Sequence, residues 1–331
     1  MLEDKLSAPF SNSAGTSIEV GWSVGIATAA AGRSNITDVL RQADQEMFAQ
    51  KAESATQRRA WSTTERAVAQ ALKENRVTVH YQPLMHLGDE GPTLVGAEAL
   101  ARIESKSGKL LVPADFLDGV KDTEVGALLD QSVIDAAIAQ TAQWKSNHLV
   151  DDSFKISVNL GPASLRNHDN LRQIADAMDR RGLPGHSLVL EISESANDID
   201  SEGLDWLAER HVEVAIDDLG IERSNLDRLL NTDADYVKLD QRWLLGERER
   251  RLEVVTSLVD LVHRLGLTPI AEGVETVEDC QLLRRIGVYI AQGYRFSKPL
   301  AANEFIQIAQ QWQPYRPHKA DTSATRSRSL S

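Results

Sequence analysis

Eight β-rich runs constrain what this chain can fold into, because stretches of helical composition separate them from the second run onward. The runs lie at 77–84, 95–102, 155–160, 188–193, 212–218, 236–240, 268–274 and 289–294. Strand–helix alternation over about 250 residues is typical of a (β/α)₈ barrel. Only residues 85–94 join the first two runs, whereas a parallel crossover needs about a dozen residues or more, usually including a helix. The pattern therefore predicts an α/β fold, a modified TIM-like barrel whose first strand is antiparallel.

The predicted barrel spans residues 57–312 and lies between two segments of different composition. Residues 1–55 carry one alternating strand pattern and one amphipathic helix pattern, which bury too little apolar surface for an independent core. We expect a docked appendage or a partial domain there. Residues 313–331 are rich in Ser, Thr, Lys and Arg with almost nothing apolar, and we expect this tail to be disordered.

The charge balance limits the classes of partner. The chain has 36 Lys and Arg residues against 49 Asp and Glu residues, a net charge of −13. Nucleic-acid polymers and anionic membranes are bound through a basic face, so neither is an expected partner. The single Cys280 cannot form an internal disulfide, and the sequence shows neither a signal-peptide pattern nor the ~20 apolar residues of a transmembrane helix. These features predict a cytoplasmic protein.

A polar residue lies within, or at the end of, seven successive apolar runs. These residues are Glu98, Asn159, Glu191, Asp217, Lys238, Glu272 and Gln292. Any one of them alone could be a rim or salt-bridge residue, but a buried carboxylate without a partner is costly. A barrel gathers the carboxyl ends of its strands at one mouth, where the active sites of barrel enzymes lie. We therefore expect the seven side chains to form one site.

Most side chains of this set offer oxygen atoms as metal ligands, and four of them could do so together: Glu98, Asn159, Glu191 and Asp217. Such donors favour Mg²⁺ or Mn²⁺ over zinc. The adjacent Asp217 and Asp218 could serve two metal ions, which is the usual apparatus for in-line phosphodiester hydrolysis. Lys238 could then hold the attacking water or stabilise charge on the phosphate. An alternative is an unrelated barrel enzyme with a Schiff-base Lys238, which leaves the carboxylates unexplained.

Short motifs follow one another from about residue 75 to residue 300. They read YQP at 81–83, EALAR at 98–102, SVNL at 157–160, EISES at 191–195, DD at 217–218, KLD at 238–240, AEGVET at 271–276, QGY at 292–294 and SKPL at 297–300. Taken in this order, the motifs resemble those of the EAL-domain family of bacterial cyclic di-GMP phosphodiesterases. The resemblance implies a modified barrel and hydrolysis of cyclic di-GMP to linear pGpG with Mg²⁺ or Mn²⁺ in a two-metal site.

The resemblance also implies roles for individual residues. The ligands of the first metal would be Glu98, Asn159, Glu191 and Asp217, and those of the second Asp217, Asp218 and Glu272. The catalytic groups would be Glu98, Asp217, Lys238 and Glu272, with Lys238 contacting the water or a site anion. Contacts with substrate or site waters would come from Gln82, Leu100, Arg102, Asp240, Gln292 and Pro299. Glu194 and Glu275 would support the loop after Asp218, and the barrel would form a homodimer.

One segment departs from the family pattern. After Asp217-Asp218 the family reads FGTGYSSL, whereas this chain reads LGIERSNL at 219–226. In the family this loop orders the second metal site. The departure at 219–225 therefore leaves an alternative open, in which the chain is an EAL-type receptor or regulatory scaffold that binds cyclic di-GMP with slow turnover or none.

Residues 1–55 carry a resemblance of their own. Residues 20–27 (VGWSVGIA), followed by Ala43-Asp44, Met47-Phe48 and Lys51, are similar to the closing part of a GGDEF diguanylate cyclase domain. The GGDEF signature is missing from this sequence, so we expect no cyclase activity, and a GGDEF or sensor domain would be lost or separate. An unrelated α/β cap is the alternative.

Overall fold

The computed structural model describes residues 61–193, 200–219, 232–243 and 249–312, together with the short strands β1 (Phe10–Ser11) and β2 (Ser17–Ile18). The chain divides into two compact units. One comprises Met1–Arg76 and Ile103–Leu129, and the other comprises Val77–Arg102 and Asp130–Ser331. The expectations for most of residues 1–55, for the loop at 220–231 and for the tail at 313–331 fall outside the described residues.

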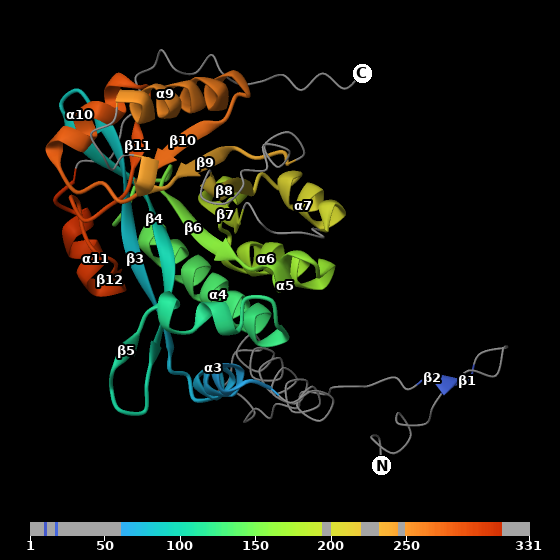
Figure 1. Cartoon of the computed structure of the whole chain (residues 1–331). Coiled ribbons are helices and arrows are strands. Elements are labelled where there is room, and N and C mark those ends of the chain that lie inside the picture. Colours follow the sequence, from blue (N-terminus) through green and yellow to red (C-terminus); the bar gives the residue numbers. More distant parts are fainter. Residues whose placement is uncertain are drawn as a thin grey trace. The chain divides into compact units, whose positions relative to one another are not determined.

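The larger unit is built on a closed barrel (Figure 1). Among the described residues, eight strands form its wall: β3 (Val77–Gly88), β4 (Gly91–Glu104), β6 (Lys155–Leu160), β7 (Leu188–Ser193), β8 (Glu213–Leu219), β9 (Tyr236–Leu239), β10 (Thr268–Ala271) and β11 (Ile290–Ala291). They pair in the order β3-β11-β10-β9-β8-β7-β6-β4, and a pairing between β3 and β4 closes the ring. Neighbouring strands from β4 to β11 are parallel, whereas β3 is antiparallel to β11. The predicted barrel with one reversed strand is confirmed.

The turn between β3 and β4 explains the reversed strand. Only Asp89 and Glu90 separate the end of β3 from the start of β4 at Gly91. Two residues can join antiparallel strands but not parallel ones. Gly91 has a φ of +122°, which residues with a Cβ rarely adopt. The predicted connection at 85–94 was wrong in length, because the backbone ladder continues into residues whose side chains are partly exposed.

Helices follow the barrel strands along the chain. They are α4 (Glu124–Ser146), α5 (Pro162–Leu165), α6 (His168–Arg181), α7 (Ser201–Ala208), α9 (Glu249–Arg264), α10 (Val277–Arg285) and α11 (Ala302–Ala309), with 3₁₀ turns at Gly185–Ser187 and Gln241–Trp243. Strand β12 (Leu300–Ala301) pairs with β3 beside the barrel. Asn167 caps the start of helix α6, and Gly182, with φ +62°, caps its end. None of the helices in the described ranges is long and apolar enough to cross a membrane.

The smaller unit contains helix α3 (Thr63–Lys73), the end of β4, the short strand β5 (Leu110–Leu111), the 3₁₀ turns Pro113–Asp115 and Leu117–Gly119, and the start of α4. A capping box fixes the start of α3. The Ser62 hydroxyl accepts from the Glu65 amide at 3.1 Å, and the Glu65 carboxylate accepts from the Ser62 amide at 2.6 Å. Strand β5 pairs antiparallel with the last residues of β4.

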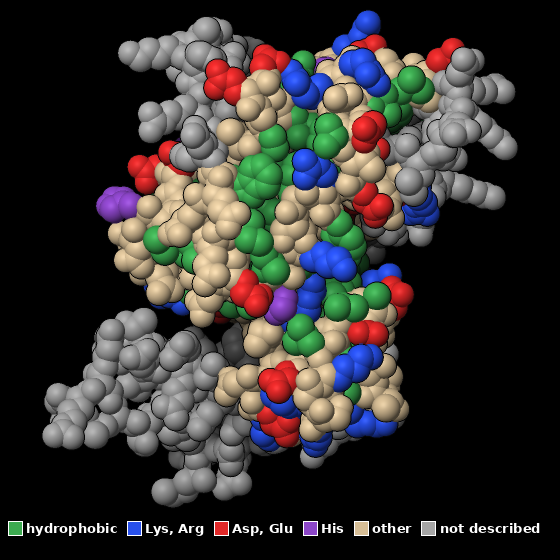
Figure 2. Space-filling view, turned by 90° about the vertical axis from the view of Figure 1, so that its left-hand side faces the viewer, with side chains coloured by type: hydrophobic (Ala, Val, Ile, Leu, Met, Phe, Trp, Pro, Cys, Tyr) green, Lys and Arg blue, Asp and Glu red, His purple; other side chains and the backbone are tan. Residues whose placement is uncertain are grey.

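Surface charge is mixed where it can be seen. On the face shown in Figure 2, Lys and Arg side chains are interspersed with Asp and Glu side chains, and hydrophobic side chains lie between them. The described residues on this face therefore form no continuous basic surface of the kind that nucleic-acid polymers need.

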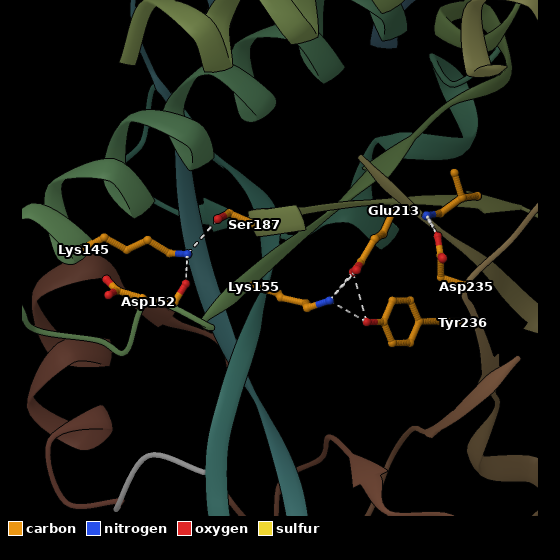
Figure 3. A network of polar contacts seen from close by, with 8 residues as sticks. Lys145, Asp152, Lys155, Ser187, Glu213, Asp235 and Tyr236 are labelled. Carbon is orange, nitrogen blue, oxygen red and sulfur yellow. Dashed lines mark hydrogen bonds and ion pairs between the residues drawn. The ribbon is translucent and has the colours of Figure 1, made fainter. Parts of the chain in front are cut away.

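Polar contacts tie together the starts of the strands (Figure 3). We call this set the strand-start network: Lys145, Asp152, Lys155, Ser187, Glu213, Asp235 and Tyr236. At its centre the Lys155 ammonium forms an ion pair with the Glu213 carboxylate and lies 2.8 Å from the Tyr236 hydroxyl, which donates to Glu213 at 3.0 Å. Lys145 of α4 donates to the Ser187 hydroxyl at 2.7 Å and to the Asp152 carbonyl at 2.6 Å. The network joins β6, β8 and β9 across the barrel.

We expect Lys155→Met to lower the free energy of unfolding by about 1–2 kcal/mol, because it leaves the half-buried Glu213 carboxylate without its cation. Urea unfolding followed by circular dichroism measures the change. Lys121→Met is the matched control, because Lys121 pairs with the exposed Asp118 and its loss should cost less than about 0.5 kcal/mol. Equal losses in the two variants would contradict a stabilising role of the network.

Candidate active site

Lys238 lies at the centre of the polar side chains that the sequence singles out. It belongs to β9 and is 1% exposed. Its Nζ atom is 2.7 Å from Glu191 Oε2 and from Glu272 Oε1, and 3.4 Å from Glu98 Oε2 and Asp217 Oδ1. We call these five residues the Lys238 cluster. It brings together side chains from β4, β7, β8 and β9 and from the residue that follows β10.

Two amides join the Lys238 cluster through Glu98. Asn159 Nδ2 donates to Glu98 Oε1 at 2.8 Å, and Gln292 Nε2 donates to Glu98 Oε2 at 2.7 Å. Gln292 Nε2 also lies 3.1 Å from Glu272 Oε1. The structure thus brings together all seven polar residues that interrupt the apolar runs.

Strand register explains why these residues meet. In parallel pairs, Asn159 lies opposite Glu191, and Asp217 lies opposite Ser193, two residues after Glu191. Side chains two residues apart on a strand point to the same face, so Glu191 and its neighbours on β6 and β8 share the barrel interior near the carboxyl ends of the strands.

A glycine fixes the course of the chain beside Glu272. Gly273 has a φ of +65°, and a Cβ at this position would lie 2.4 Å from Gln241 Cβ. Any other residue would be strained and would clash there. The tight turn directs the chain from β10 back toward β11, where the Val274 amide donates to the Gln292 carbonyl at 3.0 Å. Glu272 and Gln292 are held together by this backbone contact.

The electrostatics of the cluster are unbalanced, since in the described structure four carboxylates approach one ammonium. Burial, together with the charge of Glu98, raises the pKa of Glu191 well above its usual value. Burial raises the pKa of Glu272 to about 7. Burial acts in the same direction on Glu98, but Lys238 and the two amides hold the pKa of that carboxyl below its usual value. Although burial opposes it, the surrounding carboxylates raise the pKa of Lys238.

The donor set fits a hard divalent cation. Carboxylate and amide oxygens are the ligands that Mg²⁺ and Mn²⁺ prefer. Gln292 Oε1 is buried without a hydrogen-bond partner among the described residues, and the excess negative charge calls for a further cation. Within those residues, no group of three or more His, Cys, Asp or Glu side chains is arranged to hold a metal ion. The Lys238 ammonium stands between the carboxylates, and the Asp218 side chain lies outside the described part of the chain.

The predicted substrate contacts occupy several elements. Gln82 of β3 and Arg102 of β4 are buried; Gln82 donates to the Ser297 carbonyl at 3.2 Å and Arg102 to the Ala101 carbonyl at 2.8 Å. Leu100 is half-buried in β4 and Pro299 directly precedes β12. The Asp240 carboxylate, just after β9, accepts hydrogen bonds from the Arg242 amide and side chain at 2.7 and 2.9 Å. Burial lowers the pKa of Arg102, whereas the nearby charge of Glu98 in the Lys238 cluster raises it.

Of the two residues predicted to support the loop after Asp218, the structure describes only Glu275. Glu194 falls outside the described residues. Glu275 is exposed, and its backbone amide donates to the Asp279 carboxylate at 3.1 Å at the start of α10. The support of the loop stays a prediction.

Sequence reasoning missed Asp130. This residue of α4 contacts the turn that follows β6, through the Gly161 amide and the Ser164 hydroxyl. The available signal was a carboxylate placed directly after Leu128 and Leu129 in an apolar helical stretch. One such residue is indistinguishable in sequence from a solvent-facing position.

Fold and site together define an α/β barrel with a carboxylate-rich mouth. The family model for the EAL domain matches residues 65–299, and the chain therefore belongs to the EAL domain family. The oxygen sensor protein DosP of Escherichia coli is 33% identical over 247 residues, which cover 72% of this chain and 30% of DosP. The bifunctional diguanylate cyclase/cyclic di-GMP phosphodiesterase MucR of Pseudomonas aeruginosa is 30% identical over 243 residues, which cover 72% of this chain and 35% of MucR. The chain thus spans about a third of the length of these curated relatives.

Solved structures share the fold. The PaMucR phosphodiesterase in complex with c-di-GMP is similar with a TM-score of 0.67 and 28% identity, over 74% of this chain and all of that one (100%). The EAL enzyme Bd1971, in a form bound to cAMP and cyclic-di-GMP, is similar with a TM-score of 0.70 and 22% identity, over 84% of this chain and 77% of that one. The second likeness concerns the fold alone.

The raised pKa of Glu272 predicts how stability depends on pH in the metal-free protein. A folded-state pKa of about 7 exceeds the usual 4.5, so the folded state binds more protons than the unfolded state between these values, and stability falls as pH rises through them. We expect Glu272→Gln to reduce the loss of stability between pH 5 and pH 8 by about 2 kcal/mol, since one pKa unit corresponds to about 1.4 kcal/mol.

Urea unfolding at pH 5, 6, 7 and 8 with a chelator present measures this dependence. Glu278→Gln, which removes an exposed carboxylate from α10, should leave it unchanged. An unchanged pH dependence in Glu272→Gln would show that Glu272 is ionised normally in the folded protein.

Proposed function

We propose that this chain is a phosphodiesterase that hydrolyses cyclic di-GMP to linear pGpG with Mg²⁺ or Mn²⁺. The observation that carries the proposal is the Lys238 cluster, whose buried carboxylates exceed the positive charge that Lys238 supplies. Membership of the EAL domain family supports the same reading, as does the likeness to MucR, which is named a cyclic di-GMP phosphodiesterase. In this proposal the chain acts in the cytoplasm in bacterial second-messenger signalling, as a homodimer formed through the barrel.

Metal ions would be held by the oxygen ligands of the site. Glu98, Asn159, Glu191 and Asp217 would hold one ion, and Asp217, Asp218 and Glu272 the other. Bound ions of this kind neutralise charge on the phosphate and make water more acidic. Every carboxylate of the cluster would then stay ionised at neutral pH, because a nearby positive charge lowers the pKa of a carboxyl.

The chain's own side chains would carry out the remaining steps. Water attacks the phosphorus, the bond to the 3′ oxygen breaks, and the single linear product carries a 5′-phosphate and a 3′-hydroxyl. Glu272, whose carboxylate lies 2.7 Å from the Lys238 ammonium, would take the proton of the attacking water. The Lys238 ammonium would hold this water or stabilise the phosphate charge. Arg102 would bind phosphate oxygens through its planar guanidinium.

The remaining substrate contacts are proposed for the residues around this centre. These are Gln82, Leu100, Asp240, Gln292 and Pro299. Gln82 and Gln292 have amides that can reach the substrate or waters of the site, and Leu100 offers an apolar surface beside Arg102.

A hydrolysis assay tests the proposal directly. The protein, cyclic di-GMP and Mn²⁺ are incubated, and the nucleotides are separated by chromatography. We expect pGpG from the native chain and a loss of about 10³-fold or more in Glu98→Ala, since removal of a metal ligand disables the electrostatic stabilisation of the transition state. Glu104→Gln, an exposed carboxylate on the same strand, should keep full turnover. If enzyme in an amount equal to the cyclic di-GMP forms no pGpG, the proposal is contradicted.

The altered sequence at 219–225 favours a second candidate, a receptor that binds cyclic di-GMP without cleaving it. If this loop limits turnover, replacing it with the family sequence should raise the rate of pGpG formation by about tenfold or more, while the Kd for cyclic di-GMP changes little. Single-turnover kinetics and calorimetry measure the two quantities. An equal turnover rate in the native and replaced chains would remove the loop as a determinant of activity.

A further inference from the structure

Asp130 places a carboxylate against the turn that follows β6. It belongs to α4, and its Oδ2 atom accepts two hydrogen bonds, from the Gly161 amide at 2.8 Å and from the Ser164 hydroxyl at 2.7 Å. Gly161 directly follows β6, and Ser164 lies in the first turn of α5. A single oxygen thus fixes a backbone group and a side chain of the same turn.

The segment depends on Asp130 for part of its hydrogen bonding. Gly161 is the residue that precedes α5, and it has no side chain with which to cap the helix. Its carbonyl accepts hydrogen bonds from the Ser164 and Leu165 amides, at 3.0 and 3.1 Å. Asp130 completes the turn from outside the segment, because it accepts from the Gly161 amide that no local group satisfies.

Burial makes the ionised form of Asp130 energetically unfavourable. Burial raises the pKa of Asp130 to about 7, although the two hydrogen bonds act in the opposite direction. Among the residues that the structure describes, Asp130 forms no ion pair, so hydrogen bonds alone compensate its charge. A buried carboxylate without a neighbouring cation is expected where function requires one.

The turn held by Asp130 begins at Gly161, two residues after Asn159. Asn159 donates to Glu98 Oε1 at 2.8 Å through Nδ2, so this contact sets the orientation of its amide and leaves the amide oxygen for another partner. Displacement of Gly161 would shift the end of β6 and with it the Asn159 side chain. Displacements of about 1 Å near a reacting centre are enough to reduce activity substantially.

We propose that Asp130 is a positioning residue of this site, which holds the turn after β6 so that the Asn159 amide oxygen is directed at a divalent metal ion. The inference rests on the proposed metal-dependent function. Asp130 itself touches neither metal nor substrate. It acts through Gly161 and Ser164.

Calorimetric titration of Mn²⁺ into the metal-free full chain tests the inference without relying on turnover. We expect Asp130→Ala to weaken Mn²⁺ affinity by about tenfold or more, the range typical of residues that orient a metal ligand. Asp130→Asn, which keeps an acceptor oxygen, should restore most of the affinity. Ser164→Ala should weaken binding less than Asp130→Ala, and the double variant should bind no more weakly than Asp130→Ala, because the Ser164 hydroxyl contributes only through its hydrogen bond to Asp130.

Two controls separate positioning from general destabilisation. Asp135→Ala removes another carboxylate from α4, which accepts from Gln131, and should bind Mn²⁺ like the native chain. Lys155→Met destabilises the barrel at the strand-start network and should also retain affinity. If Lys155→Met loses as much affinity as Asp130→Ala, the inference is overturned.

The remaining outcomes are distinguishable. If the native chain does not bind Mn²⁺, the proposed function fails and the inference fails with it. If the native chain binds and the Asp130 and Ser164 variants bind equally well, the inference fails while the proposed function stands. If circular dichroism shows that Asp130→Ala does not fold, Ser164→Ala and Asp130→Asn decide the matter, because each retains part of the contact.

Discussion

The attraction between the Lys238 ammonium and the four carboxylates around it is the interaction on which the barrel mouth depends. Carboxylates from β4, β7 and β8 and from the end of β10 can approach one another only if a cation compensates their repulsion. Lys238 supplies that cation from β9 in the described structure. The seven interruptions of the apolar runs are consequently one electrostatic unit, in which removal of any member changes the ionisation of the others.

A second polar group, the strand-start network, lies at the opposite ends of the strands and differs in one respect. Lys155 and Asn159 share a face of β6, as Glu213 and Asp217 do on β8, because side chains alternate along a strand. In the strand-start network, Lys155 faces Glu213, so one positive charge meets one negative charge. The Lys238 cluster has an excess of negative charge instead. The balanced charge of the Lys155–Glu213 pair suits a structural contact. The excess negative charge of the Lys238 cluster indicates a site that takes up a cation.

The sequence predicts the barrel well because the relevant signals are local. Short β-rich runs separated by helical stretches located the strands, and the short connection after β3 was enough to predict the reversed strand. The full lengths of β3 and β4 were not predictable in this way, since their outer residues pair through the backbone and their side chains are partly exposed. Asp130 was missed because its partners, Gly161 and Ser164, lie about thirty residues away, and a helical pattern shows no contact across that distance.

The altered loop at 219–225 and the Lys238 cluster bear on different parts of the function. The charge excess of the cluster comes from residues on strands or directly after one, and would attract a first cation whatever the loop sequence is. In the proposed mechanism, a second cation would depend on Asp218, which directly precedes the altered loop. An enzyme and a receptor built on this chain would therefore share the first metal site and differ in the second. Hydrolysis is then more sensitive to the loop than nucleotide binding is, because the second cation matters most when charge develops in the transition state.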